Sequence, residues 1–196
     1  MLIPFVVSGL RKTRAKLAQN ERENFVLPEG CMVNVEFSEK HDERFEKHFS
    51  SQMDDITLIL KCHLLLEEML RDFCSEMVPQ SQFLKDSRFT FAQILDLSRA
   101  LYPADIKLGS MAELWSVCEK INRIRNMMAH ALDPDSSKLE SHKASIIEAI
   151  RLRGEGNTSS LEFAGCLTYV LGAFSLILQV GVTHKNGEDF RHIPRK

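Results

Sequence analysis

The sequence predicts a small all-α protein, a bundle of four to five main helices. Apolar residues recur at three- and four-residue spacing through most of the chain, as they do along the buried face of an amphipathic helix. Prolines and capping residues divide these periodic segments into helix-sized lengths. The 196 residues suffice for one domain whose apolar core needs no disulfide or metal.

Residues 1–38 are predicted to form an irregular arm before the helical domain. Pro28 and Gly30 interrupt any helix there. Apolar and polar residues alternate from Met32 to Phe37, and this pattern allows one short strand, which would pair with another copy of the chain or pack as an arm. Basic residues follow the short apolar start instead of preceding it, so no secretory signal is expected.

The helical domain is expected to span residues 39–184. Its first helix is predicted from Glu39 to Met77, where Pro79 ends it. The charged run EKHDERFEKH at the start of that helix is typical of a solvated face. A short amphipathic helix follows over Phe89 to Leu101.

Two capping patterns predict the next helices. Ser110 and Glu113 form a capping box for a helix that runs to about Leu132. Asp133 and Pro134 then supply an N-cap and a first-turn proline for the helix after it.

The last helix is predicted to begin with a capping box of Ser159 and Glu162, and residues 185–196 to form a loose polar tail. From Phe163 to Val182 the chain carries no charged residue, over nearly the length of a membrane span. The segment also holds three glycines and several polar side chains. A protein core contains such all-round apolar helices, so we expect a core or dimer-interface helix, with a membrane anchor as the alternative.

Composition narrows the class of function. The net charge of −2 does not indicate a general nucleic-acid or membrane-surface binder, so RNA contact would need a local basic patch. The five cysteines are odd in number and scattered, which indicates a reducing, cytoplasmic location. No metal-ligand spacing is present among the cysteines and histidines, and we predict no metal and no cofactor.

The string RIRNMMAHALDP holds the candidate site. Asn122, Asn126 and His130 are four residues apart and share one helical face, with Arg125 beside Asn126. A guanidinium fits a phosphate, an amide orients it, and a histidine near a helix C-terminus is favoured in its protonated form. Together these groups suit phosphodiester chemistry. The structural alternative for His130 is a helix C-cap without chemistry.

A second candidate lies in the long helix. Glu67 falls on an apolar stripe, one turn after His63, and a carboxylate there needs a partner. Arg125 is the partner we expect, either to orient its guanidinium for catalysis or as a purely structural ion pair. His63 itself is interpreted as a packing histidine.

Arg125 to His130 matches the R-x4-6-H motif of HEPN domains, with the polar residue after arginine that this family favours. HLLLEEML, from His63 to Leu70, resembles the family's other core helix, and FTFAQILDLSRALYP resembles the mannitol-operon-repressor-like subgroup. The resemblance covers about residues 50–132. Toxins of this type that are modified on a tyrosine have it two residues after the histidine, where this chain has Leu132, so such regulation is not expected.

The resemblance implies a HEPN-type helical bundle that works as a homodimer. It implies a metal-independent endoribonuclease of a toxin–antitoxin or phage-defence system, with RNA and an antitoxin or regulatory protein as partners and no membrane. His130 would be the acid/base, Arg125 would stabilise the phosphate, Asn126 would orient the reacting groups, and Glu67 and Asn122 would support them. The alternative is a non-catalytic transcriptional regulator or adaptor that acts through protein contacts.

Overall fold

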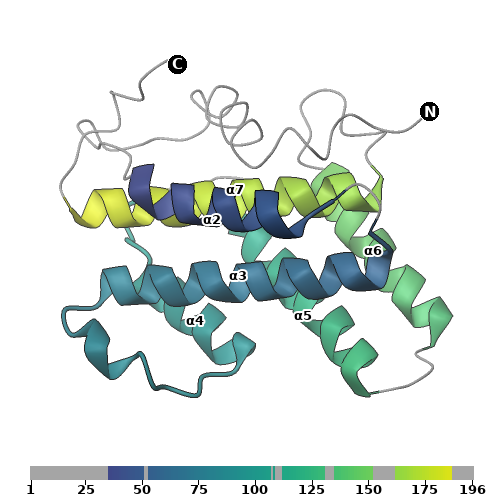
Figure 1. Ribbon diagram of the computed structural model, residues 1–196, viewed down its shortest axis with the longest axis horizontal. Coiled ribbons are helices and arrows are strands. Elements are labelled where there is room, and N and C mark those ends of the chain that lie inside the picture. The colour runs from purple at the N-terminus through teal and green to yellow at the C-terminus, as the bar shows by residue number, and fades with distance from the viewer. Residues whose placement is uncertain are drawn as a thin grey trace, which may run out of the picture.

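A computed structural model describes residues 35–50, 53–106, 108, 112–130, 135–151 and 162–186. These residues form a bundle of α-helices (Figure 1), which confirms the all-α fold predicted from the sequence. The elements in chain order are α2 (Val35–His48), α3 (Asp55–Met77), the short 3₁₀ helix η2 (Ser81–Phe83), α4 (Phe91–Leu101), α5 (Leu114–His130), α6 (Ser136–Arg151) and α7 (Phe163–Lys185).

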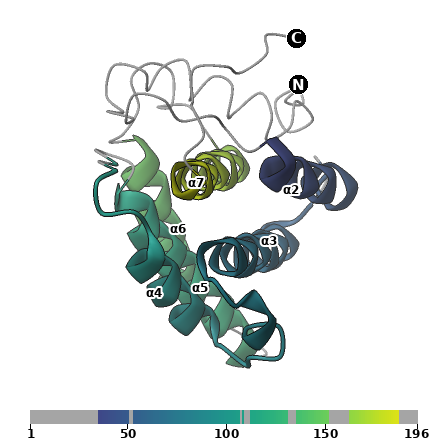
Figure 2. The same ribbon diagram turned by 90° about the vertical axis from the view of Figure 1, so that its left-hand side faces the viewer.

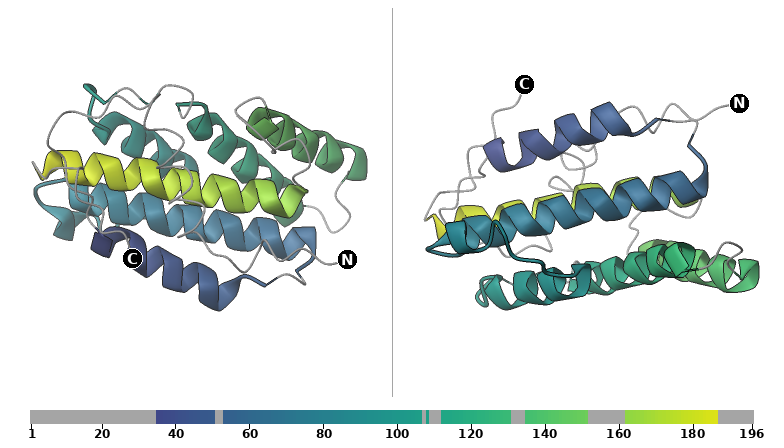
Figure 3. Two further views of the ribbon diagram at one scale, coloured as in Figure 1. Left: turned by 90° about the horizontal axis from the view of Figure 1, so that it is seen from above. Right: turned by 60° about the horizontal axis from the view of Figure 1, so that its bottom comes forward.

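Helices α3 and α7 lie side by side along the middle of the bundle (Figures 1 and 3). Helix α2 covers one side of this pair, and α4, α5 and α6 cover the other (Figure 2). The facing sides hold large, fully buried side chains, among them Leu66, Leu70 and Phe73 of α3 and Phe174 of α7. Burial of these apolar groups is the main stabilisation of the bundle.

The helix predicted from Glu39 to Met77 is two helices, α2 and α3. Asp54 caps the start of α3, because its Oδ1 accepts a hydrogen bond from the Thr57 N–H (2.9 Å) and its Oδ2 accepts one from the Thr57 hydroxyl (2.7 Å). The predicted strand is wrong where the structure describes it, since Val35–Phe37 belong to α2; residues 32–34 lie outside the described residues. An alternating pattern over three residues is too short to specify a strand when the residues that follow form a helix.

The charged run in α2 is a solvated face only in part: Glu43, Arg44, Glu46, Lys47 and His48 are exposed, as predicted. His41 and Asp42 are buried in the bundle. Lys40 Nζ lies 2.7 Å and His41 Nε2 2.9 Å from Asp72 Oδ2 on α3, so one carboxylate holds two side chains of α2. Glu68, also on α3, lies 3.4 Å from both Lys40 and Arg44. The charges of α2 therefore attach it to α3.

Side-chain caps mark the starts of α4 and α6, and the residues that form these caps differ in part from the predicted ones. Thr90 and Gln93 form a reciprocal capping box at α4. At α6 the cap is Asp135, whose Oδ1 accepts from the backbone N–H of Ser137 (3.0 Å) and Lys138 (3.2 Å). The other predicted caps lie outside the described residues: Ser110, Asp133, Pro134 and Ser159.

Helix α7 is packed inside the bundle. The predicted capping box placed Glu162 in the first turn of this helix, and this is wrong. Glu162 lies just before α7, with extended backbone and no side-chain capping hydrogen bond. Among the described helices, α7 is long and apolar enough to cross a membrane, and 72% of its most apolar window is buried in the bundle. The phenol of Tyr102 donates a hydrogen bond to the Ile177 carbonyl (3.0 Å), which joins the end of α4 to α7.

Cysteines occupy core positions, as small apolar residues do. Cys62, Cys74, Cys118 and Cys166 are all buried. Burial raises the pKa of the Cys62 and Cys118 thiols, which keeps both protonated at neutral pH. Cys31 lies outside the described residues.

Candidate functional site

The candidate residues lie on α3 and α5, which pack against each other and cross at an oblique angle (Figure 1). The buried face of α5 consists of Leu114, Trp115, Val117, Cys118, Ile121 and Ile124. Asn122, Arg125 and Asn126 follow the edge of that face and are partly buried. The helix thus carries its polar groups from the edge of the core toward solvent at its C-terminal end.

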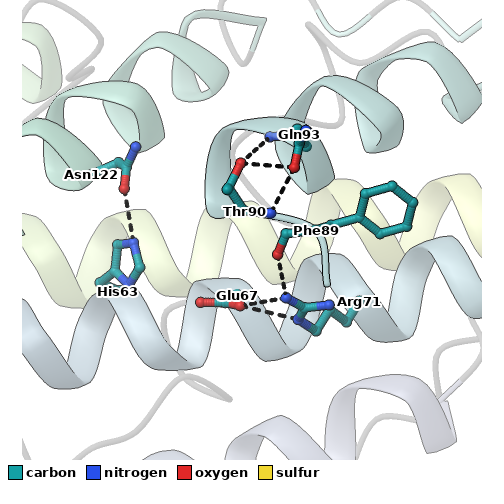
Figure 4. A network of polar contacts seen from close by, with 7 residues as sticks. All are labelled: His63, Glu67, Arg71, Phe89, Thr90, Gln93 and Asn122. Atoms are coloured by element: carbon teal, nitrogen blue, oxygen red, sulfur yellow. Dashed lines mark hydrogen bonds and ion pairs between the residues drawn. The ribbon is translucent and has the colours of Figure 1, made fainter. Parts of the chain in front are cut away.

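Asn122 makes the hydrogen bond that joins the two helices. Its Oδ1 lies 3.1 Å from Nε2 of His63 on α3 (Figure 4). His63 is 4% exposed, and its ring lies against Phe91 of α4 with 4.3 Å between the ring centroids. The sequence interpretation of His63 as a packing residue did not include this bond to a candidate site residue.

The surroundings of His63 keep the imidazole neutral. Burial lowers its pKa most, and the positive charge of Arg125 lowers it further. The hydrogen bond with Asn122 and the negative charge of Glu67 act in the opposite direction without cancelling the effect. A neutral ring that faces an amide oxygen must carry its proton on Nε2 to donate this bond.

Glu67 pairs with Arg71 and not with Arg125, so the predicted partner is wrong. Its Oε1 accepts from Arg71 Nη2 (2.7 Å) and Nε (3.1 Å), and Arg71 Nη2 also donates to the Phe89 carbonyl (2.8 Å; Figure 4). Arg71 is one turn along the same helix, so it reaches the carboxylate without crossing between helices. The pair fixes the chain segment that enters α4.

The motif residues lie on the last two turns of α5. Arg125 Nη1 donates to Asn126 Oδ1 (3.1 Å), which couples the guanidinium to the amide. His130 is the last residue of α5 and is exposed. His130 is four positions after Asn126, so the imidazole is one helical turn beyond the amide. The structure thus brings Arg125 and Asn126 together and leaves His130 open to solvent beside them.

Two solvent-open hollows border these residues. One, of about 240 Å³, lies between α4 and α5 and is lined by Ala92, Leu95, Asp96, Glu119, Asn122 and Arg123. The other, of about 310 Å³, lies on α3 and is lined by Leu64, Glu67, Glu68, Arg71 and Asp72. Asn122 therefore has a buried partner on one side and an open hollow on the other.

An exposed apolar stripe follows α3 beside the site. Ile56, Leu60 and Leu64 are 49%, 38% and 63% exposed, and their four-residue spacing places them on one face of the helix. Glu67 lies on the same side of α3, one turn from His63. A contiguous apolar stripe of this kind is typical of a surface that a protein partner covers.

No protein-family model, no curated protein and no solved structure matches this chain. Among the described residues, no group of three or more His, Cys, Asp or Glu side chains is arranged to hold a metal ion. The site is therefore defined by its own groups, which are a guanidinium, two amides, a buried neutral imidazole and an exposed imidazole. Such groups can bind a phosphate and transfer protons.

Proposed function

We propose that the chain is a HEPN-type endoribonuclease, metal-independent and cytoplasmic, that acts as a homodimer in a toxin–antitoxin or phage-defence system. The observation that carries this proposal is the arrangement on the last turns of α5. Arg125 and Asn126 are hydrogen-bonded to each other at the edge of the core, and His130 is exposed one turn further on. A bound phosphodiester would contact all three.

The chemistry follows from these groups. The 2′-hydroxyl of the RNA attacks the adjacent phosphorus, the bond from phosphorus to the 5′ oxygen breaks, and the products are a 2′,3′-cyclic phosphate and a 5′-hydroxyl. His130 moves the proton, as a base toward the 2′-hydroxyl and as an acid toward the leaving oxygen. Arg125 stabilises the charge that develops on the phosphate, and Asn126 holds the guanidinium and a phosphate oxygen in place.

The apolar stripe of Ile56, Leu60 and Leu64 supports the homodimer. In a symmetric dimer the same surface is used by both copies, and a stripe along one helix can pair with itself in the opposite direction. Such pairing would set the motif of one copy beside that of its partner, because α5 packs on α3. Two histidines would then serve as base and acid.

The same stripe also favours a second candidate, a regulator or adaptor without catalysis. An amphipathic helix of another protein, such as an antitoxin or a transcriptional regulator, would cover three apolar residues in this geometry equally well. In that case Arg125 and His130 contribute to protein contacts and not to cleavage. α7 is assigned to the core in both candidates, and recovery of folded protein without detergent tests that assignment.

The test is a cleavage assay of the purified protein on total cellular RNA with EDTA present. We expect cleavage by the wild type and none by His130→Ala or Arg125→Ala, with all three proteins folded and of equal oligomeric state. His142→Ala is the matched control, since His142 is a partly exposed histidine on α6, outside the site. Absence of cleavage by folded, dimeric wild type would favour the regulator.

A further inference from the structure

The hydrogen bond between His63 and Asn122 has a consequence for the face of α5 that meets solvent. His63 is held on two sides, by the ring of Phe91 and by the amide of Asn122, the second of which is drawn in Figure 4. A histidine confined in this way offers its Nε2–H in one direction only. It can therefore fix the orientation of whatever side chain accepts that bond.

The bond determines where the other end of the Asn122 amide points. An amide has one oxygen and one NH2 group, on opposite sides of the same carbon. Because the oxygen faces His63, the NH2 group points away from it (Figure 4). Asn122 is also one of the residues that line the open hollow between α4 and α5, so its two N–H donors are available to a ligand there.

We propose that His63 is a positioning residue and that Asn122 is the substrate-binding group it positions, a donor to a phosphate or sugar oxygen of the RNA. This inference rests on the proposed function. Asn122 is one turn before Asn126 on the same helix, so the donor extends the strip of Arg125, Asn126 and His130 toward the N-terminus of α5. It would contact a nucleotide next to the one being cleaved.

The neutral state of His63 matters for this arrangement. Glu67 is engaged by both Nε and Nη2 of Arg71, so its carboxylate is held in place at that ion pair. A protonated His63 would bury a second positive charge near Arg125, and both the burial and the repulsion disfavour it. The neutral ring still donates from Nε2, so it orients the amide without a buried charge.

The first test compares His63→Gln with His63→Leu. The Gln side-chain nitrogen can occupy the position of Nε2 and donate the same bond, whereas Leu fills similar space and donates nothing. We expect kcat/KM for RNA cleavage to fall about tenfold in His63→Leu, as loss of one oriented hydrogen bond does, and to stay within about threefold of wild type in His63→Gln. Equal loss of activity in both variants, or no loss in either, would overturn the proposal.

A second readout needs no cleavage and separates this inference from the proposed function. The side-chain NH2 signals of Asn122 in the ¹H–¹⁵N NMR spectrum, assigned by their absence in Asn122→Ala, report its orientation. They should keep their shifts in His63→Gln and move or broaden in His63→Leu, while signals of the α7 backbone stay in place. Addition of a non-cleavable RNA of fully 2′-O-methylated nucleotides should shift them in the wild type. Unchanged Asn122 signals in His63→Leu would refute the positioning role even if the wild type cleaves RNA, and failure of the wild type to cleave would refute only the proposed function.

Discussion

Replacing Gly181 with alanine tests how tightly α7 packs in the middle of the bundle. A Cβ at this position would lie 2.9 Å from Cε2 of Phe73 and 3.0 Å from Cε2 of Tyr102, both closer than carbon atoms pack. Neither ring can move freely, because Phe73 is fully buried and the Tyr102 hydroxyl is bonded to the Ile177 carbonyl. The close approach of the three elements therefore requires glycine.

The magnitude follows from two opposing effects. Alanine is favoured over glycine inside a helix by about 1 kcal/mol. Overpacking a well-filled core costs about 1–3 kcal/mol, and contact with two ring edges places this site in the upper half of that range. We expect Gly181→Ala to lower the free energy of unfolding by about 1–2 kcal/mol, measured by urea denaturation followed by circular dichroism.

A double-mutant cycle checks the cause. Phe73→Leu removes the ring edge that the new Cβ would meet, so Gly181→Ala should be less destabilising in that background by at least about 0.5 kcal/mol. A Gly181→Ala protein more stable than wild type, as helix propensity alone would give, would refute the packing of α7 against Phe73 and Tyr102.

Three further predictions concern α2, α3 and the dimer. Burial raises the pKa of Asp72, but the hydrogen bonds and charges of His41 and Lys40 outweigh burial and lower this pKa below its ordinary value. The Asp72 carboxylate therefore stabilises the fold above about pH 4, and this contribution is lost as the pH falls through the folded-state pKa. Asp72→Asn should therefore lose stability at pH 7 and show a smaller loss on acidification than wild type in urea titrations; equal acid sensitivity would contradict the ion pairs. Asp54→Ala removes the side-chain cap of α3 and should lower the free energy of unfolding by about 1 kcal/mol. Asp54→Gly should cost less, because glycine is tolerated at an N-cap, and an equal loss in both variants would contradict the capping role of Asp54. Leu64→Lys should convert the proposed dimer to folded monomers in sedimentation velocity, whereas Phe83→Lys, at an exposed apolar residue of η2, should leave the dimer intact. A dimer that persists in Leu64→Lys would exclude the α3 stripe as the interface.

The sequence was sufficient to predict most helices, because apolar spacing reports the buried face of each helix directly. The break between α2 and α3 was missed although its signal is local: Asp54 with Thr57 is an N-cap pattern, without the glutamate of a capping box. The burial of His41 and Asp42 was missed for a different reason. A run of charges looks solvated unless its partners are known, and these partners, Glu68 and Asp72, are about thirty residues further along.

For the site, too, local features could be predicted from the sequence and contacts between helices could not. Its placement on α5 follows from residue spacing, which puts Asn122, Asn126 and His130 along one strip of a helix. The partner of Glu67 could not be chosen from sequence, because residue spacing places Arg71 one turn away on the same helix but does not tell how close Arg125 of another helix comes. Likewise the contact between His63 and Asn122 depends on how α3 crosses α5, which no single-helix pattern encodes.

Analysis of the cleavage products tests the central claim most directly. A short RNA is incubated with wild type or His130→Ala in EDTA, beside the same sequence made with 2′-O-methyl groups, and the ends of the fragments are identified by mass spectrometry. We expect fragments with 2′,3′-cyclic phosphate and 5′-hydroxyl ends from the unmodified RNA and the wild type alone. Equal cleavage by His130→Ala, or cleavage of the methylated RNA, would contradict it.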